Sequence, residues 1–124
     1  AGISLIVAMI MILVVLYMSV SERTREIGVL KSIGARKRDI KKIFTTESFL
    51  IGLFSGLVGI VFAGVVGGLL VLLFNSILGF APLSFHWYYF LLALGLSVVI
   101  SVLAGLYPAS KAAKLDPVES LRHE

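Results

Sequence analysis

The 124-residue sequence has no cysteine and few charged residues, and both shortages narrow what the protein can be. Without cysteine there is no disulfide framework and no site built on thiolates. Only 15% of the residues are charged, against roughly a quarter in an average soluble domain, while 59% are hydrophobic. A soluble domain of this length could not bury so much apolar surface. The composition therefore excludes an ordinary soluble domain and indicates an integral membrane protein.

The charges are gathered in two patches beside long uncharged runs. Residues 1–21 carry no charge, and neither do residues 48–110. Residues 22–42 hold eight basic and three acidic residues, a net charge of +5, whereas residues 111–124 hold three of each sign. The positive balance of the chain thus comes from one short segment between apolar runs, and we expect no nucleic-acid partner.

Three apolar runs are long enough to cross a membrane, which takes about 20 residues for a ~30 Å hydrocarbon core. Residues 2–20 and 87–108 match that length. Residues 43–74 exceed it, so this span is expected to tilt or to extend past the bilayer. We therefore predict an all-α integral membrane fold in a single domain 1–124, with a loop at 21–42, a turn-rich loop at 75–86 and a tail at 109–124.

The distribution of Lys and Arg predicts the orientation, because short cytoplasmic loops carry an excess of these residues. The loop 21–42 has eight of them and the loop 75–86 has none. We expect the first loop and the C-terminal tail in the cytoplasm of a cell-membrane protein, and the N-terminus outside. The first span lacks a basic segment before it and is followed by positive charge, unlike a signal peptide. Because the chain opens at Ala1 inside an apolar run, we expect it to be a piece whose upstream part is missing.

Small residues recur at four-residue spacing and predict close helix packing. Such rows let membrane helices approach each other, although glycine is also simply common in these helices. Two parallel rows in one span favour packing, and we expect an interface able to slide or rock. The candidate packing residues are Gly52, Gly56, Gly64 and Gly68 in one row, Gly59, Ala63 and Gly67 beside it, and Ser97, Ser101 and Gly105 in the last span.

The loop 21–42 contains a predicted short amphipathic helix. Ser21 can cap its start. Ile27, Leu30 and Ile33 fall on one face at helical spacing, and Gly34-Ala35 ends the pattern. One interpretation is a helix held at the surface by anionic lipid. The sharper interpretation is a docking element for a cytoplasmic protein.

The remaining polar residues do not indicate catalysis. The sequence has no phosphate-binding loop, no paired carboxylates in the spans and no nucleophile beside a base, and His86 and His123 are isolated, so we expect no enzyme activity, cofactor or metal site in this chain. Glu47 is expected to be an interfacial ion-pair partner of Lys41, Lys42 or lipid headgroups rather than a proton relay.

Two long motifs resemble the FtsX-like permeases, the MacB and LolC/LolE type of ABC transporter. Residues 22–40, ERTREIGVLKSIGARKRDI, resemble the segment after that family's second transmembrane helix. Residues 106–122, LYPASKAAKLDPVESLR, resemble its closing signature. The resemblance covers essentially the whole chain.

The resemblance implies a specific role. Family members have four transmembrane helices with a large external domain between the first and second, so this chain would lack the first helix and that domain. They act as homo- or heterodimers with ABC ATPase subunits or domains, which bind the ATP and Mg, and convert ATP-driven closure into movement outside the membrane. The coupling helix that docks on the ATPase would comprise Arg25, Glu26, Ile27, Gly28, Leu30, Lys31, Ile33, Gly34 and Ala35, with Ile27, Leu30 and Ile33 filling an apolar groove. The alternative is a non-transporting membrane anchor or assembly subunit.

Overall fold

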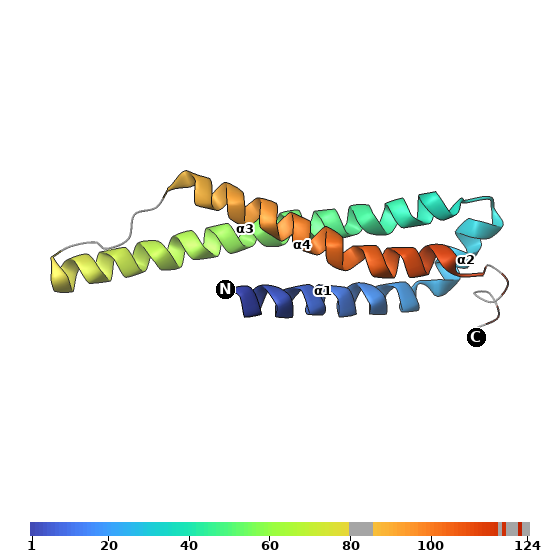
Figure 1. Cartoon of the computed structure of the whole chain (residues 1–124), viewed down its shortest axis with the longest axis horizontal. Helices are drawn as coiled ribbons and strands as arrows, with labels where there is room; N and C mark the ends of the chain where they lie inside the picture. Colours follow the sequence, from blue (N-terminus) through green and yellow to red (C-terminus); the bar gives the residue numbers. More distant parts are fainter. Residues whose placement is uncertain (80–85, 117, 119–121, 123–124) are drawn as a thin grey trace.

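The computed structural model describes residues 1–79, 86–116, 118 and 122. In these residues the chain forms helices α1 (Gly2–Glu22), α2 (Thr24–Ser32), α3 (Lys37–Leu78) and α4 (Trp87–Lys114) (Figure 1). By length and composition, α1, α3 and α4 are each able to cross a membrane. For the described part of the chain, the predicted fold class is confirmed: three long apolar helices, with a short helix between the first and second.

Helix α3 is unusually long. Its 42 residues span about 63 Å, roughly twice the thickness of a hydrocarbon core. It begins six residues before the predicted span, because the basic run is itself helical: Lys and Arg are good helix formers. The Asp39 carboxylate accepts a hydrogen bond from the backbone N–H of Arg36 at 2.9 Å and so caps the first turn. At the other end Gly79 has a φ of 71° and closes the helix.

Helix α4 also extends past its predicted end. It continues through Pro108 to Lys114, so the tail predicted from residue 109 starts inside the helix. The predicted connector 75–86 likewise begins inside α3, and its residues 80–85 lie outside the described part of the chain.

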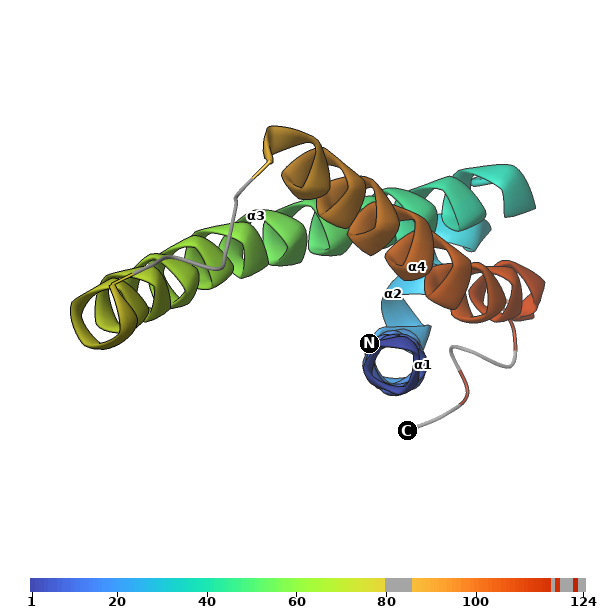
Figure 2. The same ribbon diagram turned by 60° about the vertical axis from the view of Figure 1, so that its left-hand side comes forward.

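The helices converge at one end and separate at the other. Helix α4 packs against both α3 and α1, and α2 lies where the other three helices meet (Figure 1). Figure 2 shows α3 and α4 crossing, with α1 seen nearly end-on beside them. The buried residues of α3 are Ile40, Phe44, Ser48, Gly52 and Gly56, all on the α2 side of residue 57. The packed core of the described chain therefore lies at the end that carries α2.

Candidate functional site

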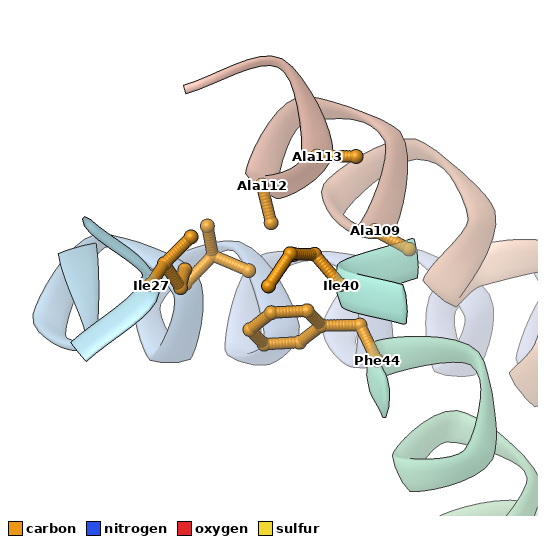
Figure 3. Packing of buried hydrophobic residues seen from close by; sticks show 7 residues of the cluster. Ile27, Ile40, Phe44, Ala109, Ala112 and Ala113 are labelled. Atoms are coloured by element: carbon orange, nitrogen blue, oxygen red, sulfur yellow. The ribbon is translucent and has the colours of Figure 1, made fainter. Parts of the chain in front are cut away.

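An apolar cluster joins α2 to the three long helices (Figure 3). Ile27 of α2 meets Ile40 and Phe44, which lie one turn apart on α3. The α4 side of the cluster is built from alanines, whose small side chains let the helices approach closely. None of the cluster residues is more than 5% exposed: Val20, Ile27, Ile40, Phe44, Ala109, Ala112 and Ala113. The cluster fixes α2 relative to the ends of the long helices.

The bend before α2 differs from the predicted one. Ser21 does not cap α2, because its hydroxyl donates to the carbonyl of Tyr17 at 3.0 Å and α1 continues to Glu22. The hydroxyl of Thr24 instead donates to the carbonyl of Ser21 at 2.8 Å, across the bend. Helix α2 therefore follows α1 almost directly.

The predicted end of α2 is confirmed. The N–H of Ala35 donates to the carbonyl of Leu30 at 3.0 Å, and that of Gly34 donates to the carbonyl of Lys31 at 3.2 Å. This pair of bonds needs a residue with positive φ between helix and loop, and Gly34 provides it with a φ of 104°. Ala35 then packs partly buried against the apolar cluster.

The exposed apolar residues of α2 differ from the predicted set in two positions: Ile27 is buried, and Val29 is exposed. Ile27 is only 3% exposed and Gly28 is also buried, so neither is available to a groove on another protein. The placement of Ile27 in that groove was wrong, because the side chain is part of the chain's own core. Leu30 is 37% exposed and Ile33 is 77% exposed. Val29, one turn before Ile33 and absent from the predicted set, is 46% exposed, and its i, i+4 spacing was the signal that could have found it.

We call Val29, Leu30 and Ile33 the apolar face of α2. Arg25 and Glu26 beside it are exposed, as is Gly34 beyond it. Val29 and Leu30 in α2 and Ile33 at its C-cap remain accessible, while Ile27 and Gly28 of the same helix are buried. This arrangement fits a docking element whose opposite side packs, through Ile27, against the long helices.

Lys31, which was predicted to belong to the docking surface, contacts the end of α4 instead. Its ammonium donates to the carbonyl of Ala113 at 2.6 Å and also to the carbonyl of Leu115, at the end of α4. Burial lowers the pKa of Lys31 below its ordinary value, the charge of Lys37 lowers it further, and the charge of Asp116 opposes this. The side chain predicted to contact the ATPase therefore contacts α4 of its own chain.

The crossing of α3 and α4 uses only part of the predicted small-residue rows. A β-carbon added to Gly52 would lie 2.8 Å from the α-carbon of Val98, and one added to Gly56 would lie 2.8 Å from a methyl carbon of Leu94. Two serine hydroxyls bridge the same crossing: Ser97 donates to the carbonyl of Gly52 at 2.9 Å and Ser101 to that of Ser48 at 2.6 Å.

Gly105 lies further along this interface, toward α2. A β-carbon there would overlap the Ser48 hydroxyl and lie 3.4 Å from a methyl carbon of Leu16 in α1. Side chains from α1 and α3 thus both lie against α4 at Gly105.

The outer glycines Gly59, Gly64 and Gly68 are not in close contact with another helix of the described chain. Among the described atoms, none lies within 4 Å of a β-carbon added at Gly59, Gly64 or Gly68. Gly59 and Ala63 line a groove between the diverging helices, together with Tyr89 and Ala93 of α4. Gly67 lies between Gly64 and Gly68 on the same stretch and is half-buried. Packing at these positions stays a prediction.

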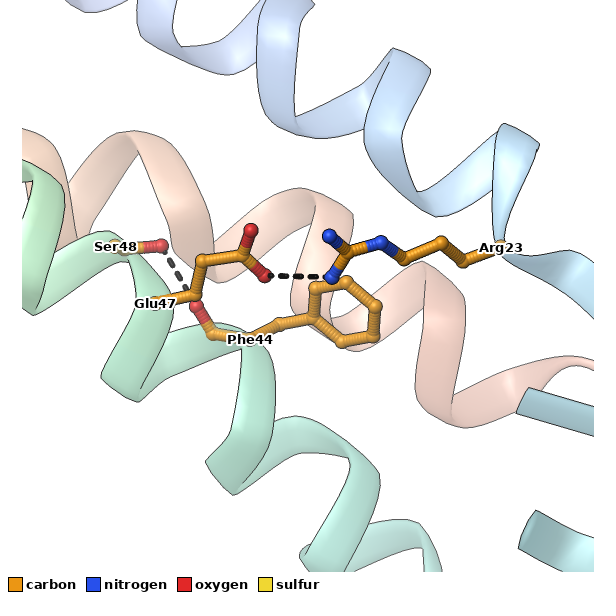
Figure 4. A network of polar contacts seen from close by, with 4 residues as sticks. All are labelled: Arg23, Phe44, Glu47 and Ser48. Carbon is orange, nitrogen blue, oxygen red and sulfur yellow. Dashed lines mark hydrogen bonds and ion pairs between the residues drawn. The ribbon is translucent and has the colours of Figure 1, made fainter. Parts of the chain in front are cut away.

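Two polar contacts were not anticipated from the sequence. Glu47 forms an ion pair with Arg23 at 3.7 Å, rather than with Lys41 or Lys42 (Figure 4). The ammonium of Lys111 donates to the hydroxyl of Tyr17 and lies 4.2 Å from the centroid of its ring, which joins α4 to α1. Within the described residues, no group of three or more His, Cys, Asp or Glu side chains is placed to hold a metal ion.

Comparison with known proteins identifies the family of this chain. The family model FtsX-like permease C-terminal matches residues 1–117. The chain belongs to this family. The macrolide export ATP-binding/permease protein MacB of Bdellovibrio bacteriovorus is 43% identical over the whole chain, and the ABC transporter permease YknZ of Bacillus subtilis is 44% identical over the whole chain. The archaeal permease MJ1507 of Methanocaldococcus jannaschii is 36% identical.

The family match covers more of the chain than the apolar spans alone. The chain spans 18% of the length of that MacB and 30% of that of YknZ. The match includes all of the first motif, residues 22–40, and residues 106–117 of the second. Together with the three apolar helices, the family assignment makes this a multi-pass membrane protein.

Proposed function

We propose that this chain is part of the membrane subunit of an ABC transporter and couples ATP hydrolysis on a cytoplasmic ATPase to conformational work on the other side of the membrane. The observation that carries this proposal is the apolar face of α2, exposed on a helix whose back is anchored in the core. A helix that only rests on lipid does not need Ile27 in an apolar cluster or Lys31 bonded to the end of α4.

The names of relatives support the same role. MacB of Bdellovibrio bacteriovorus is described as an export ATP-binding/permease protein, and YknZ as an ABC transporter permease. ATP and Mg would be bound by an ABC ATPase subunit or domain, and a second permease copy, identical or related, would complete the assembly. The hydrolysis itself is assigned to that ATPase, not to this chain.

The distribution of charge supports the orientation that we propose. The segment around α2 and the start of α3 carries exposed basic residues at Arg36, Lys37, Arg38, Lys41 and Lys42. Because positive residues in short loops stay in the cytoplasm, α2 would face the cytoplasm together with the end of α4, and the start of α1 would lie outside. Anionic lipid at the same surface would add to the binding of this segment.

The experiment uses the full-length protein with its ATPase. Leu30→Asp plus Ile33→Asp places two charges on the apolar face of α2 without touching the buried Ile27. Leu30→Met plus Ile33→Val is the matched control, because it keeps the face apolar. We expect the aspartate variant to lose co-purification of the ATPase and the coupled ATPase activity while still inserting in the membrane.

The control variant should retain both properties. Equal ATPase binding by the aspartate variant and the control would contradict the docking role of α2. It would favour the alternative, a membrane anchor whose interfacial helix is held by lipid.

A further inference from the structure

The side chain of Lys31, beside the apolar face of α2, forms hydrogen bonds with the end of α4. Lys31 follows Leu30 directly in α2, and its ammonium bonds to the carbonyls of Ala113 and Leu115, which are 82 and 84 residues away in the sequence. These carbonyls belong to the end of α4, where the last turn of a helix has no partners of its own. Lys31 therefore supplies, from a different helix, hydrogen bonds that the end of α4 lacks.

The contact of Lys31 with α4 does more than cap the end of that helix, because it joins two helices that are far apart in the sequence. Helix α4 already has Lys111 and Lys114 in its last turn, where positive charge favours the negative end of the helix dipole. A third lysine contributed by α2 adds little to that charge effect but joins two helices that the chain does not connect directly. Lys31 is half-buried, and it reaches the carbonyls from the position next to Leu30 of the apolar face.

Helix α2 also meets the bundle through apolar packing. Ile27 packs in the cluster with Ala112 and Ala113, so it resists separation of α2 from α4. Apolar contacts have no preferred direction, so on their own they specify the position of α2 along α4 less sharply than hydrogen bonds do. Hydrogen bonds from one ammonium to two carbonyls fix the position of α2 along α4, because they need defined distances and angles.

We propose that Lys31 is a positioning residue that ties α2 to the end of α4, so that displacement of α2 by the ATPase moves α4 with it. The inference rests on the proposed function, since it concerns what happens after an ATPase binds the apolar face of α2. It assigns to Lys31 a role in transmission rather than in docking. The ATPase is held by Leu30 and Ile33, and the movement passes through the neighbouring side chain.

The first test needs no ATPase. In the full-length protein in lipid, backbone hydrogen exchange of α2 and of residues 110–116 is compared between Lys31→Met and Lys41→Met. The control removes the same charge from an exposed position on α3. Since hydrogen bonds to a charged group are among the stronger ones, we expect exchange at both ends of the contact to rise by at least about fivefold in Lys31→Met only. Equal exchange in the two variants would overturn the tie between the helices.

The second test adds the ATPase. For Lys31→Met we expect ATPase co-purification to stay within about twofold of wild type, because the apolar face is intact, while coupled activity falls by at least about fivefold. Binding of the ATPase should slow exchange at residues 110–116 in the wild type and in Lys41→Met but not in Lys31→Met. Lys31→Arg, which keeps a charged donor, should restore part of the coupled activity.

The outcomes separate the two proposals. If Lys31→Met loses ATPase binding and coupled activity together, or keeps full coupling, Lys31 is not a transmission residue. If the wild-type protein binds no ATPase, or if the aspartate variant at Leu30 and Ile33 binds it normally, the docking role of α2 is wrong. In that case the exchange experiment without ATPase still decides whether Lys31 holds α2 against α4.

Discussion

Gly105 is the position where the structure makes the sharpest demand on side-chain size. A β-carbon at this position would overlap the hydroxyl of Ser48 and lie 2.5 Å from its β-carbon. The Ser48 hydroxyl also donates to the carbonyl of Phe44 at 2.8 Å, and the Ser48 carbonyl accepts from Ser101. Rotating the Ser48 side chain therefore breaks one hydrogen bond and leaves the clash between the two β-carbons in place.

The expected magnitude follows from two opposing effects of Gly105→Ala. Replacing glycine by alanine within a helix stabilises it by up to about 1 kcal/mol. Overpacking a well-packed site typically costs about 1–3 kcal/mol, and an overlap of two β-carbons belongs at the upper end of that range because a rotamer change cannot relieve it. We expect a net destabilisation of about 2 kcal/mol from the balance of these two terms.

Unfolding of the purified protein in detergent, followed by loss of helix signal, measures this difference. Gly64→Ala is the matched control, because no described atom lies within 4 Å of its new β-carbon, and it should be neutral or slightly stabilising. A double variant decides the mechanism. Ser48→Gly removes the opposing β-carbon and should rescue Gly105→Ala, whereas Ser48→Ala, which keeps that β-carbon, should not. If Gly105→Ala is as stable as Gly64→Ala, the close approach of α3 and α4 at this point is refuted.

Further predictions concern the polar contacts and the orientation. Ser101→Ala should destabilise the protein by about 0.6 kcal/mol, the average for hydrogen bonds between membrane helices, and by no more than about 1.7 kcal/mol; an unchanged unfolding midpoint would contradict the contact with Ser48. Glu47→Gln should cost less than about 1 kcal/mol, because the side chains of Arg23 and Glu47 are 51% and 30% exposed; a larger loss that added salt does not reduce would contradict this view of the ion pair. Tyr17→Phe should cost less than Tyr17→Leu, because only the second removes the ring beside Lys111; equal unfolding midpoints would argue against a contribution from the ring. In a full-length protein that carries no other cysteine, Arg38→Cys and Ser76→Cys can be labelled singly in intact cells. A reagent that cannot cross the membrane should modify only Ser76→Cys, and modification of Arg38→Cys alone would show that the proposed orientation is the wrong way round.

The apolar pattern of the sequence predicts the number and type of the long helices well, because a ~20-residue uncharged run has few other structures in a membrane. Helix ends are predicted less well. Gly34 marks the end of α2 because its positive φ is a local requirement. The start of α3 at Lys37 was missed, because charge was taken as the boundary of the span although the same basic residues are good helix formers.

Contacts between distant residues account for the other differences. The sequence shows that Ile27, Leu30 and Ile33 share a helix face, but the packing of α2 against Ile40 and Ala112 decides that Ile27 is buried. In the same way, the row of glycines in α3 indicates close packing without naming a partner. The structure gives Gly52 and Gly56 a partner in α4 and gives none to Gly64 within the described chain. The contact of Lys31 with α4 crosses 82 residues and has no local signal in the sequence.

The packing along α3 is uneven, so that a small rotation at its packed end would produce a larger displacement at its other end. The helix is gripped by its neighbours from Ile40 to Gly56 and is not buried beyond that point in the described structure. About 33 Å of helix extends from Gly56 to Leu78, so a rotation of about 5° at the crossing would move the far end by about 3 Å. A small angular change where the helices are clamped becomes a displacement the size of an atom at the opposite end. In the proposed function, helix α3 would act as a lever arm that turns about its crossing with α4.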